Sequence, residues 1–145
     1  FGCLLVLLIA LVGYKQISHF NKIGLIDNDG FYSDQAIQKL IELQPKRMYN
    51  DYSQGGYLLY KLNEYNALSK VQIFAYGLGD VFSKDILLDT VNLADLKTNP
   101  EVIINKYDFD VLLTTKNHTL HYYLDARDDF ELIYSDDMCY IYLRK

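Results

Sequence analysis

The hydrophobic positions of this chain fall into two regions with different patterns. Residues 1–14 carry neither a charge nor a strongly polar side chain, whereas apolar and polar positions alternate along the rest. A transmembrane helix needs about 20 apolar residues, so we interpret residues 1–20 as a transmembrane helix truncated at its N-terminal end. A signal-peptide core is an alternative, but no basic stretch precedes it and no Ala-x-Ala site follows. A buried helix is another, although the stretch is apolar on all sides.

Beyond residue 32, capping residues and the spacing of apolar positions predict the secondary structure. Ser33 and Ser83 are good N-caps, Pro100 suits the first turn of a helix, and Pro45 ends a helix. The pattern predicts five helices, over 34–43, over 53–64, from 84, from 100 and over 119–125, and five strands, over 46–50, 71–75, 109–115, 130–134 and 138–143.

The order of these elements predicts the fold class. Strands that alternate with helices imply parallel pairing with right-handed crossovers, and the largely apolar stretch 71–75 is interpreted as a strand buried on both faces. We therefore predict an α/β fold, a Rossmann-like three-layer sandwich with a mostly parallel sheet of about five strands and a C-terminal antiparallel hairpin. The truncated transmembrane helix (1–20) and a juxtamembrane connector (21–32) precede this soluble domain (33–145).

Charge and cysteine content narrow the class of protein. The 145 residues carry a net charge of −5, which disfavours nucleic-acid binding because phosphate backbones select clustered Lys and Arg. The pairs 46–47 and 144–145 are the adjacent basic residues, and each is interpreted as flanking a strand. Cys3 lies in the apolar stretch and Cys139 in a predicted strand, so we expect no disulfide between them.

The candidate ligand site is the turn between the first strand and the helix that follows it. Amides at a helix N-terminus attract anions, and ligands gather at the carboxyl ends of parallel strands. The loop 77–80 closes the next predicted strand and should lie at the same edge of the sheet. The alternative for the glycines is close packing of helix on sheet, and for the aspartate of the loop a helix cap. The candidate ligand-binding residues are Asp51, Tyr52, Gly55, Gly56, Tyr57 and Asp80.

Other polar residues give no catalytic or metal site. His118 and His121 are three residues apart and Asp125 is one turn further on, but zinc sites need three or four protein ligands with suitable spacing. A solvated helix face is therefore preferred to a metal site for these three residues. No nucleophile stands in a recognisable elbow with a base, so we expect no catalytic residue, metal or cofactor in this chain.

Two segments of the chain resemble a known family. The first reads Asn50-Asp51-Tyr52-x-x-Gly55-Gly56-Tyr57-Leu58, and the second contributes Tyr134, Asp136, Asp137, Tyr142 and Arg144. These segments resemble the C-terminal soluble domain of bacterial polytopic membrane proteins that are similar to GT-C-type glycosyltransferases, including mannosyltransferase-like enzymes that use polyprenyl-phosphate-linked sugars. The likeness extends over nearly the whole chain. It implies an extracytoplasmic domain that has the bilayer and the rest of a membrane domain as partners.

The chain departs from the family pattern in the loop after residue 75. The family has an acid and an arginine where this chain has Tyr76 and Leu78, while Gly77 and Asp80 match. The resemblance places the catalytic carboxylates on membrane-domain loops that this chain does not contain.

We therefore expect a non-catalytic domain that caps the membrane domain or assists a sugar acceptor or lipid-linked donor. One alternative is a single-span, membrane-anchored module that binds a glycan or a protein, which the 14 tyrosines favour. A small Rossmann-like transferase is the other.

Overall fold

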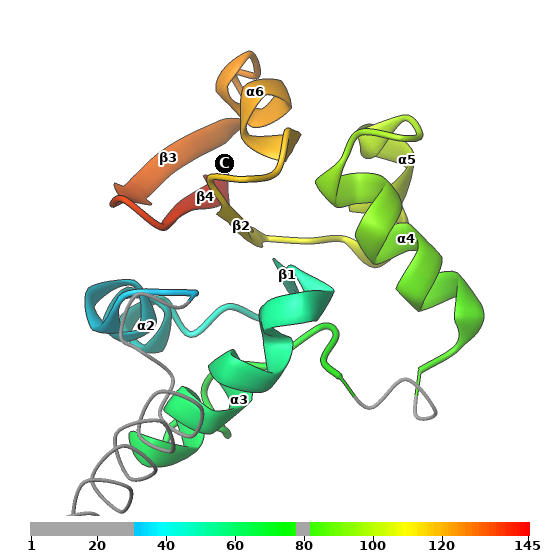
Figure 1. The fold of residues 1–145 in the computed structure, drawn as a ribbon. Helices are drawn as coiled ribbons and strands as arrows, with labels where there is room; N and C mark the ends of the chain where they lie inside the picture. Colours follow the sequence, from blue (N-terminus) through cyan, green and yellow to red (C-terminus); the bar gives the residue numbers. More distant parts are fainter. Residues whose placement is uncertain (1–30, 78–81) are drawn as a thin grey trace, which may run out of the picture. The chain divides into compact units, whose positions relative to one another are not determined.

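The computed structural model describes residues 31–77 and 82–145, which form one unit that begins at Phe31. The predicted transmembrane helix at 1–20 and nearly all of the predicted connector lie outside these residues. The elements, shown in Figure 1, are α2 (Asp34–Leu43), β1 (Met48–Asn50), η1 (Tyr52–Gln54, a 3-10 turn), α3 (Gly55–Glu64), α4 (Lys84–Ala94), α5 (Pro100–Tyr107), β2 (Val111–Thr115), α6 (Leu120–Asp125), β3 (Phe130–Ser135) and β4 (Cys139–Arg144).

Three helices begin where the two capping serines and the first-turn proline of the sequence indicate. The Ser33 hydroxyl accepts a hydrogen bond from the Ala36 amide at 3.0 Å, and α2 starts at the next residue. Ser83 and Asn99 cap α4 and α5 in the same way, and Pro100 opens α5. These predictions are confirmed because a cap satisfies amides within its own first turn and needs no distant partner.

The sheet differs from the predicted one. Its four strands run in the order β1-β2-β4-β3. Only β1 and β2 are parallel, whereas β2–β4 and β4–β3 are antiparallel. The prediction of a Rossmann-like, mostly parallel sheet of about five strands is wrong. The predicted C-terminal antiparallel hairpin is present: β4 pairs with β2, and β3 is the outermost strand on that side of the sheet.

The stretch 71–75, predicted as a buried central strand, forms no strand at all. It runs beside β1, where the buried Asn50 side chain replaces the missing ladder. The Asn50 amide group donates to the Ala75 carbonyl at 2.7 Å, and its carbonyl oxygen accepts from the Phe74 amide at 2.9 Å. Because one side chain satisfies these backbone groups, the stretch packs against β1, with Val71 and Ala75 buried, without pairing as a strand.

Helices cover both faces of the sheet. Along β1 and β2 successive side chains alternate between two hydrophobic clusters, as the pleat requires. Met48 and Val111 pack with α2 and α3 in one cluster, whereas Tyr49 and Leu112 pack with α4, α5 and α6 in the other. The carboxyl ends of β1 and β2 therefore lie at one end of a layer enclosed by apolar side chains on either side.

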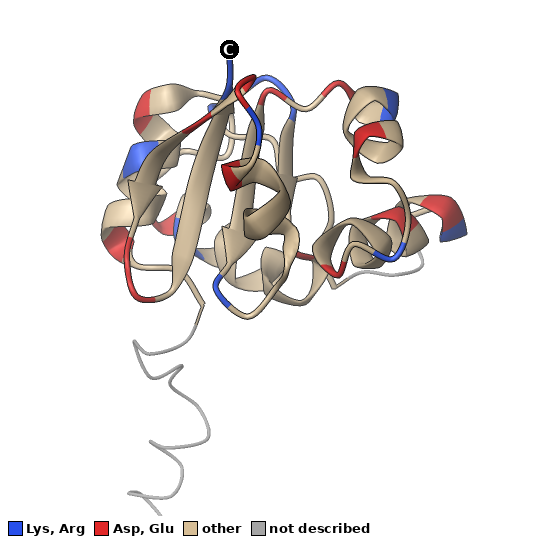
Figure 2. Ribbon diagram, turned by 90° about the horizontal axis from the view of Figure 1, so that it is seen from above, with Lys and Arg blue, Asp and Glu red and all other residues tan. Residues whose placement is uncertain are grey.

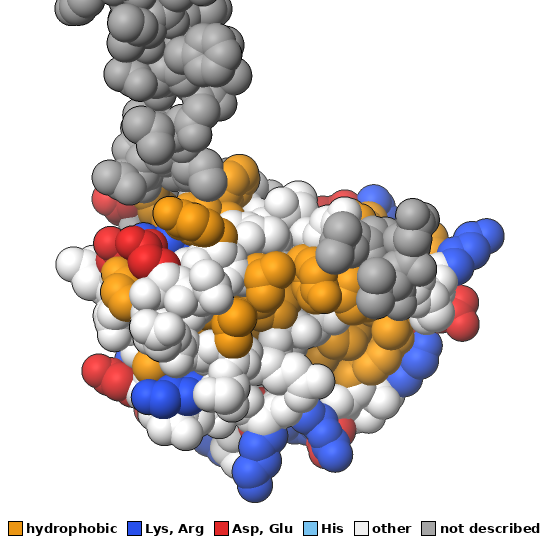
Figure 3. Space-filling view, turned by 90° about the horizontal axis from the view of Figure 1, so that it is seen from below, with side chains coloured by type: hydrophobic (Ala, Val, Ile, Leu, Met, Phe, Trp, Pro, Cys, Tyr) orange, Lys and Arg blue, Asp and Glu red, His pale blue; other side chains and the backbone are white. Residues whose placement is uncertain are grey.

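Charged and apolar groups both occur on the surface of the unit. Lys and Arg alternate with Asp and Glu along the loops and helices (Figure 2). Hydrophobic side chains also reach the surface on the face shown in Figure 3. The most exposed aromatic residues of the described part are Tyr60 and Tyr122, at 58% and 68% of their full accessible area. Within residues 31–77 and 82–145, no helix combines the length and apolar character needed to cross a membrane.

Candidate functional site

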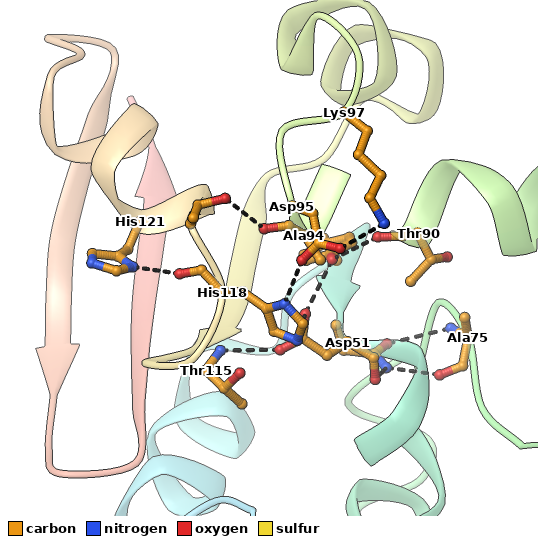
Figure 4. Close-up of polar contacts among 12 residues, drawn as sticks. Asp51, Ala75, Thr90, Ala94, Asp95, Lys97, Thr115, His118 and His121 are labelled. Carbon is orange, nitrogen blue, oxygen red and sulfur yellow. Dashed lines mark hydrogen bonds and ion pairs between the residues drawn. The ribbon is translucent and has the colours of Figure 1, made fainter. Parts of the chain in front are cut away.

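The candidate site lies at the carboxyl ends of the parallel strands β1 and β2. Asp51 follows β1 directly and Thr115 is the last residue of β2. The loop after β2 brings His118 to the same place, and the end of α4 contributes Asp95 (Figure 4). Three separate segments of sequence thus meet at one cluster of polar side chains.

Asp51 is the centre of this cluster and is almost completely buried, with 2% of its area exposed. Its Oδ2 accepts a hydrogen bond from the Thr115 amide at 3.0 Å, and its Oδ1 accepts one from the Tyr49 hydroxyl at 3.1 Å. Burial raises the pKa of Asp51 above its ordinary value, while His118 and these hydrogen bonds act in the opposite direction. The carboxylate therefore ties the end of β1 to the end of β2.

His118 stands between two carboxylates. Its Nε2 lies 3.8 Å from Asp51 Oδ1, and its Nδ1 lies 3.2 Å from Asp95 Oδ1. Lys97 pairs with the other oxygen of Asp95 at 2.8 Å. The pKa of Asp95 is lowered by its contact with Lys97 and then by that with His118. The result is a row in which Asp51, His118, Asp95 and Lys97 follow one another from the buried carboxylate to the surface.

The contacts of this row connect segments of the chain. Both ring nitrogens of His118 face a carboxylate, so neither is directed at open space where a substrate proton would lie. A catalytic histidine instead keeps one nitrogen toward the reacting group while a carboxylate orients the other. The geometry joins β1, the loop after β2 and the end of α4.

The two glycines of the predicted site have different surroundings. Gly55 is buried at the start of α3, and a Cβ placed on it would lie 2.0 Å from the carbonyl oxygen of Ala75. Gly56 is exposed, and a Cβ there would have no neighbour within 4 Å among the described residues. Close packing of helix against backbone therefore accounts for Gly55, while Gly56 remains accessible.

Of the remaining predicted residues, Tyr52 and Tyr57 are partly buried. Tyr52 is partly buried in η1, and Tyr57 is partly buried in α3 with its hydroxyl 3.3 Å from the carbonyl oxygen of Tyr32. The ring of Tyr57 also contacts Phe31, at 5.7 Å between ring centres. Asp80 lies outside the described residues, and so does most of the loop 77–80.

The row of His118, His121 and Asp125 does not form one site. His121 is buried, donates from Nδ1 to the His118 carbonyl at 2.7 Å and stacks on Tyr140. Asp125 accepts a hydrogen bond from the Tyr142 hydroxyl at 2.7 Å. The preference for a solvated helix face is wrong for His121, because its ring is enclosed. The described residues contain no group of three or more His, Cys, Asp or Glu side chains suited to a metal ion.

Sequence reasoning missed the contact of Asp51 with Thr115 and His118. These partners are more than 60 residues away from Asp51, and no spacing rule connects them. The sequence does predict both strands. Their parallel pairing brings the residues that follow them to one edge of the sheet. Asp95 follows α4 and carries no comparable signal.

The chain was compared with protein-family models and with curated proteins. No protein-family model matches the chain, and no curated protein matches it significantly. The resemblance to GT-C-type proteins rests on the motif residues alone.

Proposed function

We propose that the chain is a non-catalytic, extracytoplasmic domain of a membrane protein that resembles GT-C-type glycosyltransferases. It caps the membrane domain, or assists the binding of a sugar acceptor or of a polyprenyl-phosphate-linked donor. The proposal rests on the two motif segments and on the apolar residues 1–14.

One structural observation supports the non-catalytic part of the proposal. The polar residues of the motif are directed into the protein, where Asn50 binds the backbone at 74–75 and Asp51 binds the end of β2. Gly55 is the contact point between α3 and the Ala75 backbone. These residues are engaged in holding the fold, so the motif works as a structural joint between β1, β2 and α3.

The residues of the motif that are open to solvent are the ones proposed to contact a ligand. Gly56 is exposed and Tyr57 is partly exposed, on the first turn of α3. Amides of a helix N-terminus favour anions, and an aromatic ring beside them packs on a sugar face. A phosphosugar or a neighbouring membrane-domain loop would therefore contact this turn without displacing Asp51.

Location is tested by fractionating a bacterium that expresses the full chain. The protein should stay with the membranes after an alkaline carbonate wash, and protease added outside spheroplasts should digest it. A matched variant in which residues 1–14 are replaced by a polar sequence should be released from the membranes. Recovery of the unmodified chain in the soluble fraction, or its protection from external protease, contradicts the proposal.

Ligand assistance is tested by titrating the full chain with a polyprenyl-phosphate sugar and following the amide NMR signals. The signals of Gly56 and Tyr57 should shift saturably, and Tyr57→Ala should abolish the shift. Tyr122→Ala is the matched control, because Tyr122 is an exposed tyrosine on a different helix, α6. Equal effects of the two substitutions, or the absence of any shift, count against this role.

A second candidate is a single-span, membrane-anchored module that binds glycans or proteins. The exposure of Tyr60 and Tyr122 favours it, since exposed aromatic rings are enriched at binding surfaces. A glycan array separates the two candidates: binding to sugars without a lipid phosphate, lost in Tyr60→Ala, supports the second.

A further inference from the structure

The fold brings two basic dipeptides together at the end of the sheet opposite to Asp51. Lys46 and Arg47 precede β1, while Arg144 ends β4 and Lys145 follows it. Together they line an open hollow of about 500 Å³, with the other lining residues Asp108, Phe109 and Asp110. The sequence alone assigns each pair to the flank of a strand, because nothing in it shows that positions 46–47 and 144–145 are neighbours.

Hydrogen bonds of Asp110 hold the backbone around this basic hollow. The Asp110 carboxylate accepts from the Lys46 amide at 2.9 Å and from the Arg47 amide at 3.0 Å. The Asp110 amide in turn donates to the Arg47 carbonyl at 2.9 Å, and its carbonyl accepts from the Arg144 amide at 2.8 Å. Asp110 therefore works as the fixed floor that joins both basic segments.

Asp108 shows that the two arginines are placed to share one anion. Its Oδ2 contacts the Arg47 guanidinium, and its Oδ1 lies 3.9 Å from Nη1 of Arg144. Its side chain is 68% exposed, so solvent reaches the position between the guanidinium groups. Arg144 is further oriented by a hydrogen bond to Asn105 at 2.9 Å. A second anion that arrived here would meet two guanidinium groups that already point toward a common centre.

The two lysines supply charge that no carboxylate of the described residues neutralises. Neither Lys46 nor Lys145 forms an ion pair within residues 31–77 and 82–145, and the Lys145 ammonium donates to the Asp128 carbonyl at 3.0 Å. Four basic and two acidic side chains leave the hollow with a net side-chain charge of +2, in a chain of net charge −5. In Figure 2 blue segments gather beside the marked C-terminus at this end of the sheet.

We propose that the basic hollow binds a phosphate or diphosphate group, which takes the place of the Asp108 carboxylate between Arg47 and Arg144. Guanidinium groups bind phosphate oxygens in pairs, and lysine adds a point charge. A dianion matches the excess charge, and a hollow of this volume admits a small phosphorylated molecule. The site is separate from the Asp51 cluster and does not depend on the proposed function.

The phosphate is carried either by a free molecule or by a lipid headgroup, and the same variants test both sources. The full chain is titrated at low salt with pyrophosphate by calorimetry, and with phosphatidylcholine vesicles that contain or lack phosphatidylglycerol. Saturable binding of pyrophosphate supports a free phosphate ligand. Binding confined to the phosphatidylglycerol vesicles supports a lipid headgroup, provided that Arg47→Gln weakens it.

Two opposite substitutions make the test specific. Arg47→Gln should weaken binding about fivefold or more through the loss of a charge-assisted contact, whereas Asp108→Asn should tighten it by removing the competing carboxylate. Lys39→Gln removes the same charge from the surface of α2, outside the hollow, and should leave the affinity unchanged; thermal unfolding checks that each variant is folded. Absence of saturable binding to either probe, weaker binding in Asp108→Asn, or equal losses in Lys39→Gln and Arg47→Gln overturns the proposal.

Discussion

Asp136 ties the turn of the β3–β4 hairpin to the first turn of α2, about 100 residues earlier in the chain. Its Oδ2 accepts hydrogen bonds from the Ser33 hydroxyl and, at 2.8 Å, from the Tyr134 hydroxyl. Its Oδ1 accepts from the amides of Met138 and Cys139, at 2.8 and 2.9 Å. In Asp136→Asn one oxygen can still bind the turn amides, but an NH₂ group then faces the two hydroxyls and the charge is lost.

The expected magnitude follows from the pKa of Asp136. Burial acts to raise this pKa, but the hydrogen bonds from Ser33, Tyr134 and the turn amides outweigh it and lower the pKa to about 2. An unfolded aspartate has a pKa near 4, so the difference corresponds to roughly 2.5 kcal/mol of stability. Solvent screening at this partly exposed site reduces the figure, and we expect Asp136→Asn to cost about 1 kcal/mol at pH 6.

The sign of the pH dependence distinguishes this reasoning from a simple packing defect. Because the folded-state pKa is depressed, the stabilisation is complete above about pH 4 and disappears as the pH falls toward 2. Urea unfolding of the full chain should therefore show a gap between wild type and Asp136→Asn that closes over this range. Asp137→Asn is the control, since this neighbouring carboxylate is fully exposed and lies 3.9 Å from Lys116. Equal losses in both variants, or a gap that does not change with pH, would refute the argument.

Two further predictions concern residues in the protein interior. Gly55→Ala should destabilise the protein by roughly 3 kcal/mol, because the new methyl group would overlap the Ala75 carbonyl oxygen, whereas Gly56→Ala should change stability by less than about 1 kcal/mol; thermal unfolding checks both, and equal effects would contradict the reasoning. Burial raises the pKa of the Cys139 thiol, so in a Cys3→Ser background iodoacetamide should alkylate it slowly at pH 8 and quickly in urea; fast labelling of the folded protein would show that the thiol is accessible.

Local signals in the sequence predict much of the secondary structure. Ser33 and Pro45 enclose α2 within a few residues, and the structure places the helix at Asp34–Leu43 as expected. Such signals act within one turn of chain and do not depend on the fold. The prediction of a strand over 71–75 is wrong because the conformation of this segment depends on Asn50. The Asn50 side chain, 24 residues away in sequence, forms hydrogen bonds with the backbone of that segment. Apolar composition shows that a segment is buried, but not which groups receive its hydrogen bonds.

In the candidate site, too, local features are predictable from the sequence, whereas contacts between distant residues are not. The turn between β1 and α3 is predictable, because a strand, a polar turn and a glycine pair mark it. The contact of Asp51 with His118 requires the register of β1 against β2, which places Asn50 opposite Leu113. The basic hollow likewise requires β4 to lie beside β2, so that Arg144 comes near Arg47. Neither arrangement follows from the spacing of residues along the chain.

The Asn50 bonds to the 74–75 backbone also bear on how the molecule avoids self-association. β1 is the outermost strand of the sheet on its side, and an unprotected outer strand is a template on which a second molecule can add a strand. The segment 74–75 lies beside the end of β1 without being a strand, held there by the Asn50 side chain, so it offers no regular row of strand groups to a second molecule. A single amide side chain thereby places an irregular segment, in place of a further strand, at the end of this outer strand.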